Sequence, residues 1–125
     1  MNLNEYPTAI AKLQAEVFDL DQLIDQTCTT TKQIEAEIDS AIAQGAVAEP
    51  IAFDAALRND AQRKAKRQQL LDEHPNYWEQ QEILSQYRSK REQAFIQLCL
   101  KRNEFSVLKL EKRESIARLE LQANS

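Results

Sequence analysis

The sequence predicts an all-α fold, in which a long antiparallel helical hairpin (a coiled coil) carries a shorter middle helix near its turn. Its 125 residues include one glycine and three prolines, and these residue types are the strongest local interrupters of regular structure. They leave two long uninterrupted stretches, 8–44 and 76–123, which flank a connector and middle helix over 45–74. The stretches are rich in strong helix formers, as is typical of coiled coils. We therefore expect a single helical domain over residues 1–125.

The first arm, 8–44, carries a heptad pattern. Thr8 follows Pro7 and is expected to cap the helix, and Gly45 is expected to end it in the left-handed conformation. Between them, seam residues recur at alternating steps of three and four, which predicts a left-handed supercoil. Two seam threonines, Thr27 and Thr31, either fix the register of pairing or form a weak point whose hydroxyls bond to preceding carbonyls. The seam comprises Ile10, Leu13, Val17, Leu20, Ile24, Thr27, Thr31, Ile34, Ile38 and Ala41.

The middle segment, 45–74, is predicted to hold an extended connector followed by a short helix. The helix should begin near Asp54 or near 59–60. It should end before Pro75, because proline disfavours helical geometry in the residue that precedes it. A narrow apolar stripe runs along this helix and comprises Leu57, Ala61, Ala65 and Leu71.

A cluster of basic residues in the middle segment is the candidate nucleic-acid-binding surface. Basic side chains on one helix face can neutralise phosphates. Two alternatives remain: a solvated charged face, or contacts with the acidic first part of the chain, where residues 1–57 hold ten acidic and two basic side chains. The net charge of −4 makes nucleic acid the less favoured partner. The cluster comprises Arg58, Arg63, Lys64, Lys66 and Arg67.

The second arm, 76–123, is predicted to begin at Asn76, with Glu79 completing a capping pair. One apolar stripe follows its whole length and comprises Tyr77, Leu84, Tyr87, Ala94, Leu98, Phe105, Leu108, Ile116 and Leu119. At its start, Tyr77 and Trp78 are expected either to anchor the middle helix or to stack on bases.

A second apolar stripe lies almost opposite the first on the second arm. It comprises Ile96, Leu100, Val107, Leu110, Ala117 and Leu121. A helix that is apolar on two faces needs two partners, and the first arm covers only one face. The other face meets either the middle helix or a second copy of the protein, and we expect a homodimer. The candidate interface residues are Ile96, Leu100, Val107, Leu110 and Leu121.

The sequence offers little for catalysis. One glycine cannot build a glycine-rich phosphate loop, and His74, the only histidine, has no partner at the spacing of a metal or catalytic site. We therefore expect no enzymatic activity, no cofactor, no metal and no small-molecule substrate. Cys28 and Cys99 are far apart, which favours reduced thiols in the cytoplasm. No apolar run approaches the roughly 20 residues of a membrane span, and the first residues do not resemble a signal peptide.

Two segments, LRNDAQRKAKRQQLL (57–71) and LKRNEFSVLKLEKRESIA (100–117), resemble parts of small uncharacterised helical coiled-coil proteins of bacterial and prophage genomes. The resemblance implies a mobile-element or DNA-recombination context and carries over no site residues. The composition and periodicity predict a protein that binds itself and another protein, as a scaffold, adaptor or assembly factor. The alternative is a nucleic-acid or recombination accessory protein that uses the basic cluster.

Overall fold

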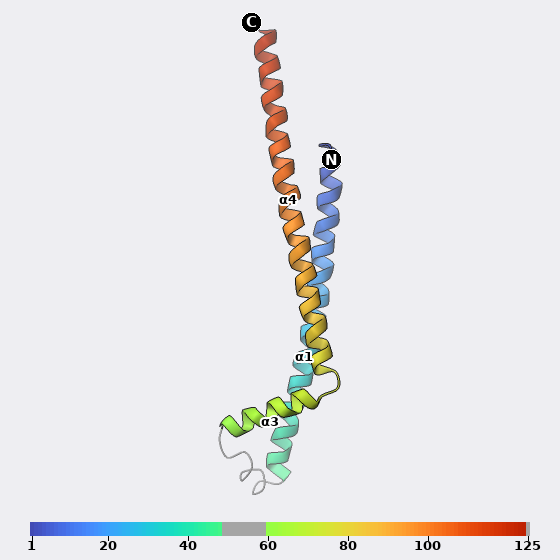
Figure 1. The fold of residues 1–125 in the computed structure, drawn as a ribbon, viewed down its shortest axis with the longest axis vertical. Coiled ribbons are helices and arrows are strands. Elements are labelled where there is room, and N and C mark those ends of the chain that lie inside the picture. The colour runs from blue at the N-terminus through green and yellow to red at the C-terminus, as the bar shows by residue number, and fades with distance from the viewer. Residues whose placement is uncertain (49–59, 125) are drawn as a thin grey trace. The chain divides into compact units, whose positions relative to one another are not determined.

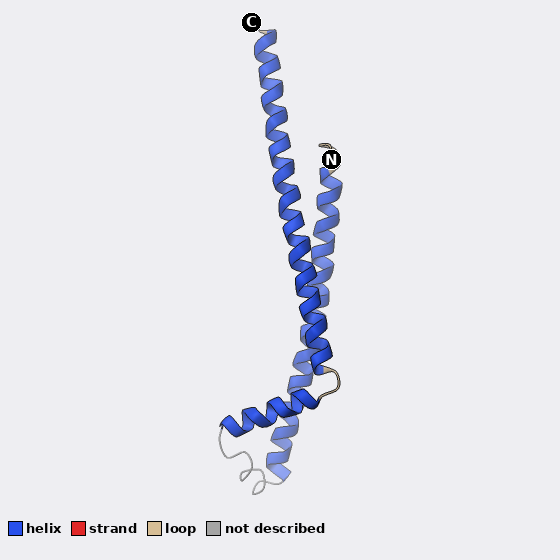
Figure 2. Ribbon diagram, viewed as in Figure 1, coloured by secondary structure: helices blue, strands red, loops and turns tan. Residues whose placement is uncertain are grey.

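The computed structural model describes residues 1–48 and 60–124. Every regular element in these residues is an α-helix (Figure 2). Helix α1 spans Tyr6–Ala48, α3 spans Asp60–Glu73 and α4 spans Tyr77–Ala123 (Figure 1). The predicted all-α hairpin with a shorter middle helix is confirmed.

Helix α1 begins two residues before the predicted start. The Asn2 amide donates to the Glu5 carboxylate at 3.1 Å, and the Glu5 carbonyl accepts from the Ala9 amide at 3.2 Å. Pro7 fits in the first turn, because the N–H that it lacks would have no helical acceptor there. The prediction that Thr8 caps the helix is therefore wrong.

Helix α1 also continues through Gly45 to Ala48. Gly45 does not adopt a positive φ, so the prediction that it ends the helix is wrong. An interior glycine costs a helix only about 1 kcal/mol relative to alanine. The next three residues, 46–48, are alanine, valine and alanine, and none of them breaks a helix.

Helix α3 begins at the second of the two expected positions, Asp60, and ends at Glu73. The His74 amide donates to the Leu71 carbonyl at 3.2 Å as the chain leaves α3. Asn76 directly precedes α4, and its carbonyl accepts the first helical hydrogen bond, from the Gln80 amide, at 2.9 Å. The extended connector was predicted over 46–53; it is wrong for 46–48, which belong to α1. The rest of the predicted connector and Leu57 lie outside the described residues.

The chain forms two compact units. The first unit contains Met1–Gln22 and Arg88–Ser125, and the second contains Leu23–Tyr87. Each unit has its own packing and is described separately.

In the first unit, the beginning of α1 packs antiparallel to the later part of α4. The Tyr6 ring stacks on Phe105 with centroids 5.6 Å apart, and the Tyr6 hydroxyl donates to Glu104 at 3.0 Å. Fifteen residues further along α1, Asp21 accepts a 3.0 Å hydrogen bond from Arg91 Nε. As the residue number rises along α1, the number of the contacted residue falls along α4. The buried apolar side chains of this unit are Tyr6, Leu20, Ala94 and Leu98.

In the second unit, α3 closes a core between α1 and the start of α4. Leu71 is its most buried side chain, at 2% exposure. The first apolar stripe of α4 contributes Tyr77, and Leu84 is also buried in this unit. Of the described members of the stripe predicted for the middle helix, Leu71 is buried, whereas Ala61 and Ala65 are exposed to solvent. The core cluster comprises Ile34, Ile38, Leu71 and Tyr77, with Ile42 and Leu70 packed against it.

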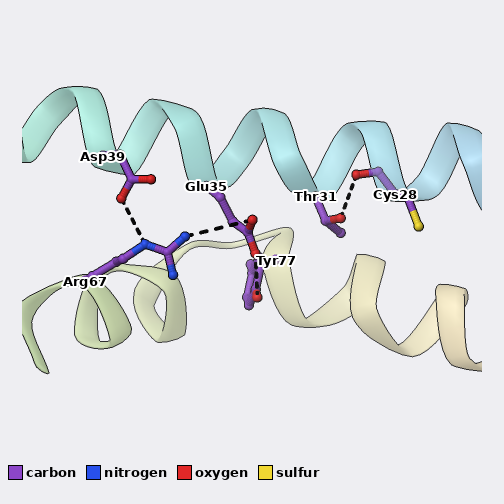
Figure 3. A network of polar contacts seen from close by, with 6 residues as sticks. All are labelled: Cys28, Thr31, Glu35, Asp39, Arg67 and Tyr77. Carbon is purple, nitrogen blue, oxygen red and sulfur yellow. Dashed lines mark hydrogen bonds and ion pairs between the residues drawn. The ribbon is translucent and has the colours of Figure 1, made fainter. Parts of the chain in front are cut away.

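The seam predicted along α1 is confirmed except at its last position. Ala41 is exposed, and Ile42 packs against the core instead, four residues after Ile38. A larger apolar side chain one position away gains more from burial than alanine does. The seam threonines are buried, and their hydroxyls donate to carbonyls in the preceding turn of α1. The Thr27 hydroxyl donates to the Leu23 carbonyl at 2.8 Å. The Thr31 hydroxyl donates to the Cys28 carbonyl at 2.8 Å (Figure 3). Of the two alternatives predicted for these threonines, this geometry agrees with the second, a weak point in the seam whose hydroxyls bond to preceding carbonyls.

Candidate interaction surfaces

The five predicted interface residues all lie on one exposed face of α4. Their exposed fractions are 50% for Ile96, 47% for Leu100, 52% for Val107, 56% for Leu110 and 72% for Leu121. At 3.6 residues per turn, this face is opposite the buried Ala94 and Leu98. The structure therefore brings these residues together on one helix face, and in the described part of the chain about half or more of each side chain is exposed.

This exposed face follows a strict heptad spacing. From Ile96 to Leu121 the steps alternate between four and three residues without a slip, over eight positions. The eight positions form the outer seam: Ile96, Leu100, Asn103, Val107, Leu110, Glu114, Ala117 and Leu121. Asn103 and Glu114 were missed when only apolar residues were considered, although the unbroken spacing would have identified both.

The last part of α4 buries none of its side chains in the first unit. All side chains from 109 to 124 are exposed. Within this unit, α4 runs beyond the N-terminal end of α1 (Figure 1). Ile116 and Leu119, the last members of the first stripe, are therefore 48% and 64% exposed. The prediction that the first arm covers the first stripe is therefore wrong at these two residues, because α1 begins at Tyr6, which stacks on Phe105.

A shallow, open hollow adjoins the outer seam in the first unit. Leu100, Asn103 and Val107 form one of its sides, and Met1 and Tyr6 form part of the other. The lining is mainly apolar, so it suits an apolar side chain from a partner better than a polar ligand.

The Tyr6–Glu104 hydrogen bond gives the first unit a pH-dependent contact. Burial raises the pKa of the Tyr6 phenol above its ordinary value of 10.0, and the hydrogen bond to Glu104 and the nearby carboxylate charges raise this pKa further. A raised pKa in the folded state means that the folded protein holds this proton more tightly than the unfolded chain does. The resulting stability is complete below the ordinary pKa and is lost as the pH rises through the folded-state pKa.

We expect the Tyr6→Phe variant to lose less stability than the wild type in alkaline solution. Phenylalanine keeps the stacked ring on Phe105 but has no proton to lose. The test compares urea unfolding midpoints at about pH 9 and about pH 11, on either side of an ordinary tyrosine pKa. An equal decrease in the two proteins would contradict the role assigned to Tyr6.

The basic cluster of the middle segment is divided by the structure. Arg67 Nε donates to Asp39 at 2.9 Å, and an Arg67 guanidinium nitrogen lies 3.8 Å from Glu35 (Figure 3). The hydrogen bond to Asp39 raises the pKa of Arg67, and desolvation partly opposes this effect. Glu35 also accepts a 3.3 Å hydrogen bond from the Tyr77 hydroxyl (Figure 3). Arg67 is therefore bound to the acidic first arm, as one of the two alternatives predicted.

The other members of the cluster lie elsewhere on α3 or outside the described residues. Arg63, Lys64 and Lys66 are exposed. Arg58 lies in the segment that the structure does not describe. The exposed basic surface is therefore smaller than the sequence suggested.

The two aromatic residues at the start of α4 have different roles. Tyr77 is buried in the core of the second unit, which confirms the predicted anchor and excludes its ring as a platform for bases. Trp78 is 53% exposed, packs edge-on against Tyr77 and donates from Nε1 to Asp72 at 3.0 Å. This hydrogen bond ties α4 to α3.

The described residues offer no metal site of protein ligands. Within 1–48 and 60–124, no group of three His, Cys, Asp or Glu residues is placed to hold a metal ion. His74 Nδ1 accepts a 3.2 Å hydrogen bond from the Asn76 amide, which gives it a local structural contact. Cys28 and Cys99 are half-buried thiols. None of the helices in this part of the chain has the length and apolar character needed to cross a membrane.

No protein-family model, curated protein or solved structure matches this chain.

Proposed function

We propose that this protein is a non-enzymatic coiled-coil interaction protein that binds a second copy of itself through the outer seam of α4. The observation that carries the proposal is the row of large apolar side chains, each about half exposed or more, on the face opposite the one that packs on α1. Contiguous exposed apolar surface of this kind is rare on monomeric proteins and marks interaction sites. Two-fold dimers are the commonest oligomers, because one patch then serves both subunits.

The length of α4 supports the same proposal. The stretch 109–123 is helical although none of its side chains is buried in the part of the chain that the structure describes. Most helical stability in proteins comes from packing an apolar face. A partner on this part of α4 would supply that packing.

The test is sedimentation equilibrium of the full chain over about 1 to 100 µM, a range that brackets dissociation constants of weak to moderate dimers. We expect the mass to rise toward twice the 14.4 kDa of one chain. A mass of one chain at every concentration would contradict the proposal.

Ile116 and Leu119 are the side chains through which we expect a further partner protein to bind. They continue the stripe that α1 covers earlier in α4, and they lie on the opposite side of the helix from the outer seam. A dimer formed through the outer seam leaves them exposed. The role that fits both surfaces is that of a scaffold, adaptor or assembly factor. The wide separation of the two cysteines in the sequence favours the cytoplasm as its location.

Nucleic-acid binding is the second candidate function, and the exposed positions of Arg63, Lys64 and Lys66 favour it. Binding through these residues would be sequence-independent and would weaken steeply with salt. The test is a salt titration with single-stranded and duplex DNA, using the Arg63→Glu/Lys66→Glu variant as the comparison. Equal binding by the variant and the wild type, or no binding at low salt, would remove this candidate.

A further inference from the structure

The outer seam of α4 is symmetric about its own midpoint. Its steps from Ile96 to Leu121 read four, three, four, three, four, three, four, which is the same sequence in both directions. A helix with such a seam can pair with an antiparallel copy of itself so that every seam position meets another seam position. The two-fold axis would then pass between residues 108 and 109.

In this pairing the apolar members of the outer seam face one another. Ile96 lies opposite Leu121 of the second copy, Leu100 opposite Ala117, and Val107 opposite Leu110. Layers of this kind, in which a residue of one helix packs among residues of the other, are the unit of coiled-coil packing. All six side chains are exposed in the single chain and available for it.

The same pairing brings the two polar members of the outer seam together. Asn103 lies five and a half positions before the midpoint, and Glu114 lies five and a half positions after it. Each Asn103 amide therefore faces the Glu114 carboxylate of the second copy, so a donor meets an acceptor. The dimer contains two such polar layers, one on each side of the axis.

Each of the other pairings considered leaves at least one of these polar groups without a suitable partner. In a parallel, in-register pair, Glu114 would face Glu114 of the second copy, and like charges at short distance repel. In an antiparallel pair shifted by one heptad, Asn103 would face Leu121 and Glu114 would face Leu110. A buried polar group without a hydrogen bond costs about 1–3 kcal/mol, and polar seam residues are known to fix the register of coiled coils at this kind of cost.

We infer that the partner of the outer seam is a second copy of α4 in antiparallel orientation, with its register fixed by Asn103–Glu114 layers. The inference rests on the proposed self-association and adds its orientation and register. The face of α4 that packs on α1 lies on the opposite side of the helix, so the first unit keeps its own contacts in the dimer. The hollow beside Leu100, Asn103 and Val107 lies along the same seam and receives side chains of the second copy.

Disulfide cross-linking tests the orientation. In a Cys28→Ala/Cys99→Ala background, the full-length Ile96→Cys and Leu121→Cys variants are oxidised alone and as an equimolar mixture. Cysteines form a disulfide only when their Cα atoms lie within about 7 Å. In the antiparallel pair, residue 96 lies beside residue 121 of the other copy and about 38 Å from its own equivalent, at 1.5 Å per residue. We therefore expect a covalent dimer in the mixture and none in either variant alone.

The other outcomes separate the two proposals. Cross-linking of each variant with itself would show a parallel pair and overturn the inference while leaving self-association in place. A dimer by sedimentation that yields no covalent product in any mixture would overturn the register. A protein that sediments as one chain under all conditions would overturn the proposed function itself.

A charge exchange tests the polar layer directly. Asn103→Asp places a carboxylate opposite Glu114 and is expected to weaken self-association about tenfold, and Asn103→Asp/Glu114→Gln is expected to restore it. This non-additive recovery is the signature of two groups in contact. Additive effects of the two substitutions would place Asn103 and Glu114 in different layers and contradict the register.

Discussion

The Val107→Glu/Leu110→Glu variant is expected to self-associate at least about 100-fold more weakly than the wild type, a loss of roughly 2.8 kcal/mol or more. Val107 and Leu110 are the seam residues nearest the axis, and both are more than half exposed in the single chain. Their replacement puts four carboxylates within the centre of the interface, where buried unpaired charges are costly. The fold of the single chain should be retained, because neither side chain is buried in it.

The matched control is Arg102→Glu, which changes the net charge by the same amount. Arg102 is exposed, and it lies about a third of a turn away from the middle of the outer seam. We expect its self-association to stay close to that of the wild type, with both variants equally helical by circular dichroism. Equal dimerisation of all three proteins, or equal loss in both variants, would show that the outer seam is not the interface.

The Leu71→Ala variant is expected to lose about 2–5 kcal/mol of stability, the usual cost of removing a fully buried leucine side chain. Leu71 is the most buried side chain of the described residues and joins α3 to Ile34, Ile38 and Tyr77. Trp78, the only tryptophan of the chain, lies beside Tyr77 and reports unfolding of this unit by its fluorescence.

The measurement is urea unfolding followed by Trp78 fluorescence, at one fixed protein concentration because self-association also affects apparent stability. The exposed Gln69→Ala change in the same helix is the control and should shift the midpoint little. A loss below about 1 kcal/mol in Leu71→Ala would mean that the core of the second unit is not organised around this side chain.

The regular parts of the fold were predictable because periodicity reports which face of a helix is buried. The α1 seam from Ile10 to Ile38 and the start of α4 follow the heptad pattern closely, and both lie where the structure packs them. The ends of α1 were less predictable, because Pro7 is compatible with the first turn of a helix and Gly45 disfavours helical geometry only locally. Whether the helix continues through such a position depends on the helix propensity of the neighbouring residues.

The extent of the pairing was not predictable, because it depends on the register between α1 and α4. No local sequence pattern indicates that Tyr6 stacks on Phe105. This register places the start of α1 beside Phe105, and the Ile116 and Leu119 side chains further along α4 are exposed. The basic cluster shows the same difficulty. Nothing in the spacing of its members separates Arg67, which binds Asp39 and Glu35, from the exposed Lys64 and Lys66.

The outer seam, in contrast, was predictable from the sequence in full, because its heptad spacing identifies the polar members as well as the apolar ones. Its apolar members define the exposed face. Its two polar members, Asn103 and Glu114, supply the orientation of the partner, because they are equidistant from the midpoint.

The outer seam of α4 is expected to be covered in solution by another copy of the chain. The decisive measurement is hydrogen–deuterium exchange of the backbone amides in 109–123 at low and high protein concentration, because no side chain of this stretch is buried against the other described residues. An uncovered helix end of this length frays and exchanges rapidly. We predict that exchange in 109–123 slows markedly as concentration rises, in the wild type and not in Val107→Glu/Leu110→Glu. Rapid exchange of this stretch at every concentration would contradict the account.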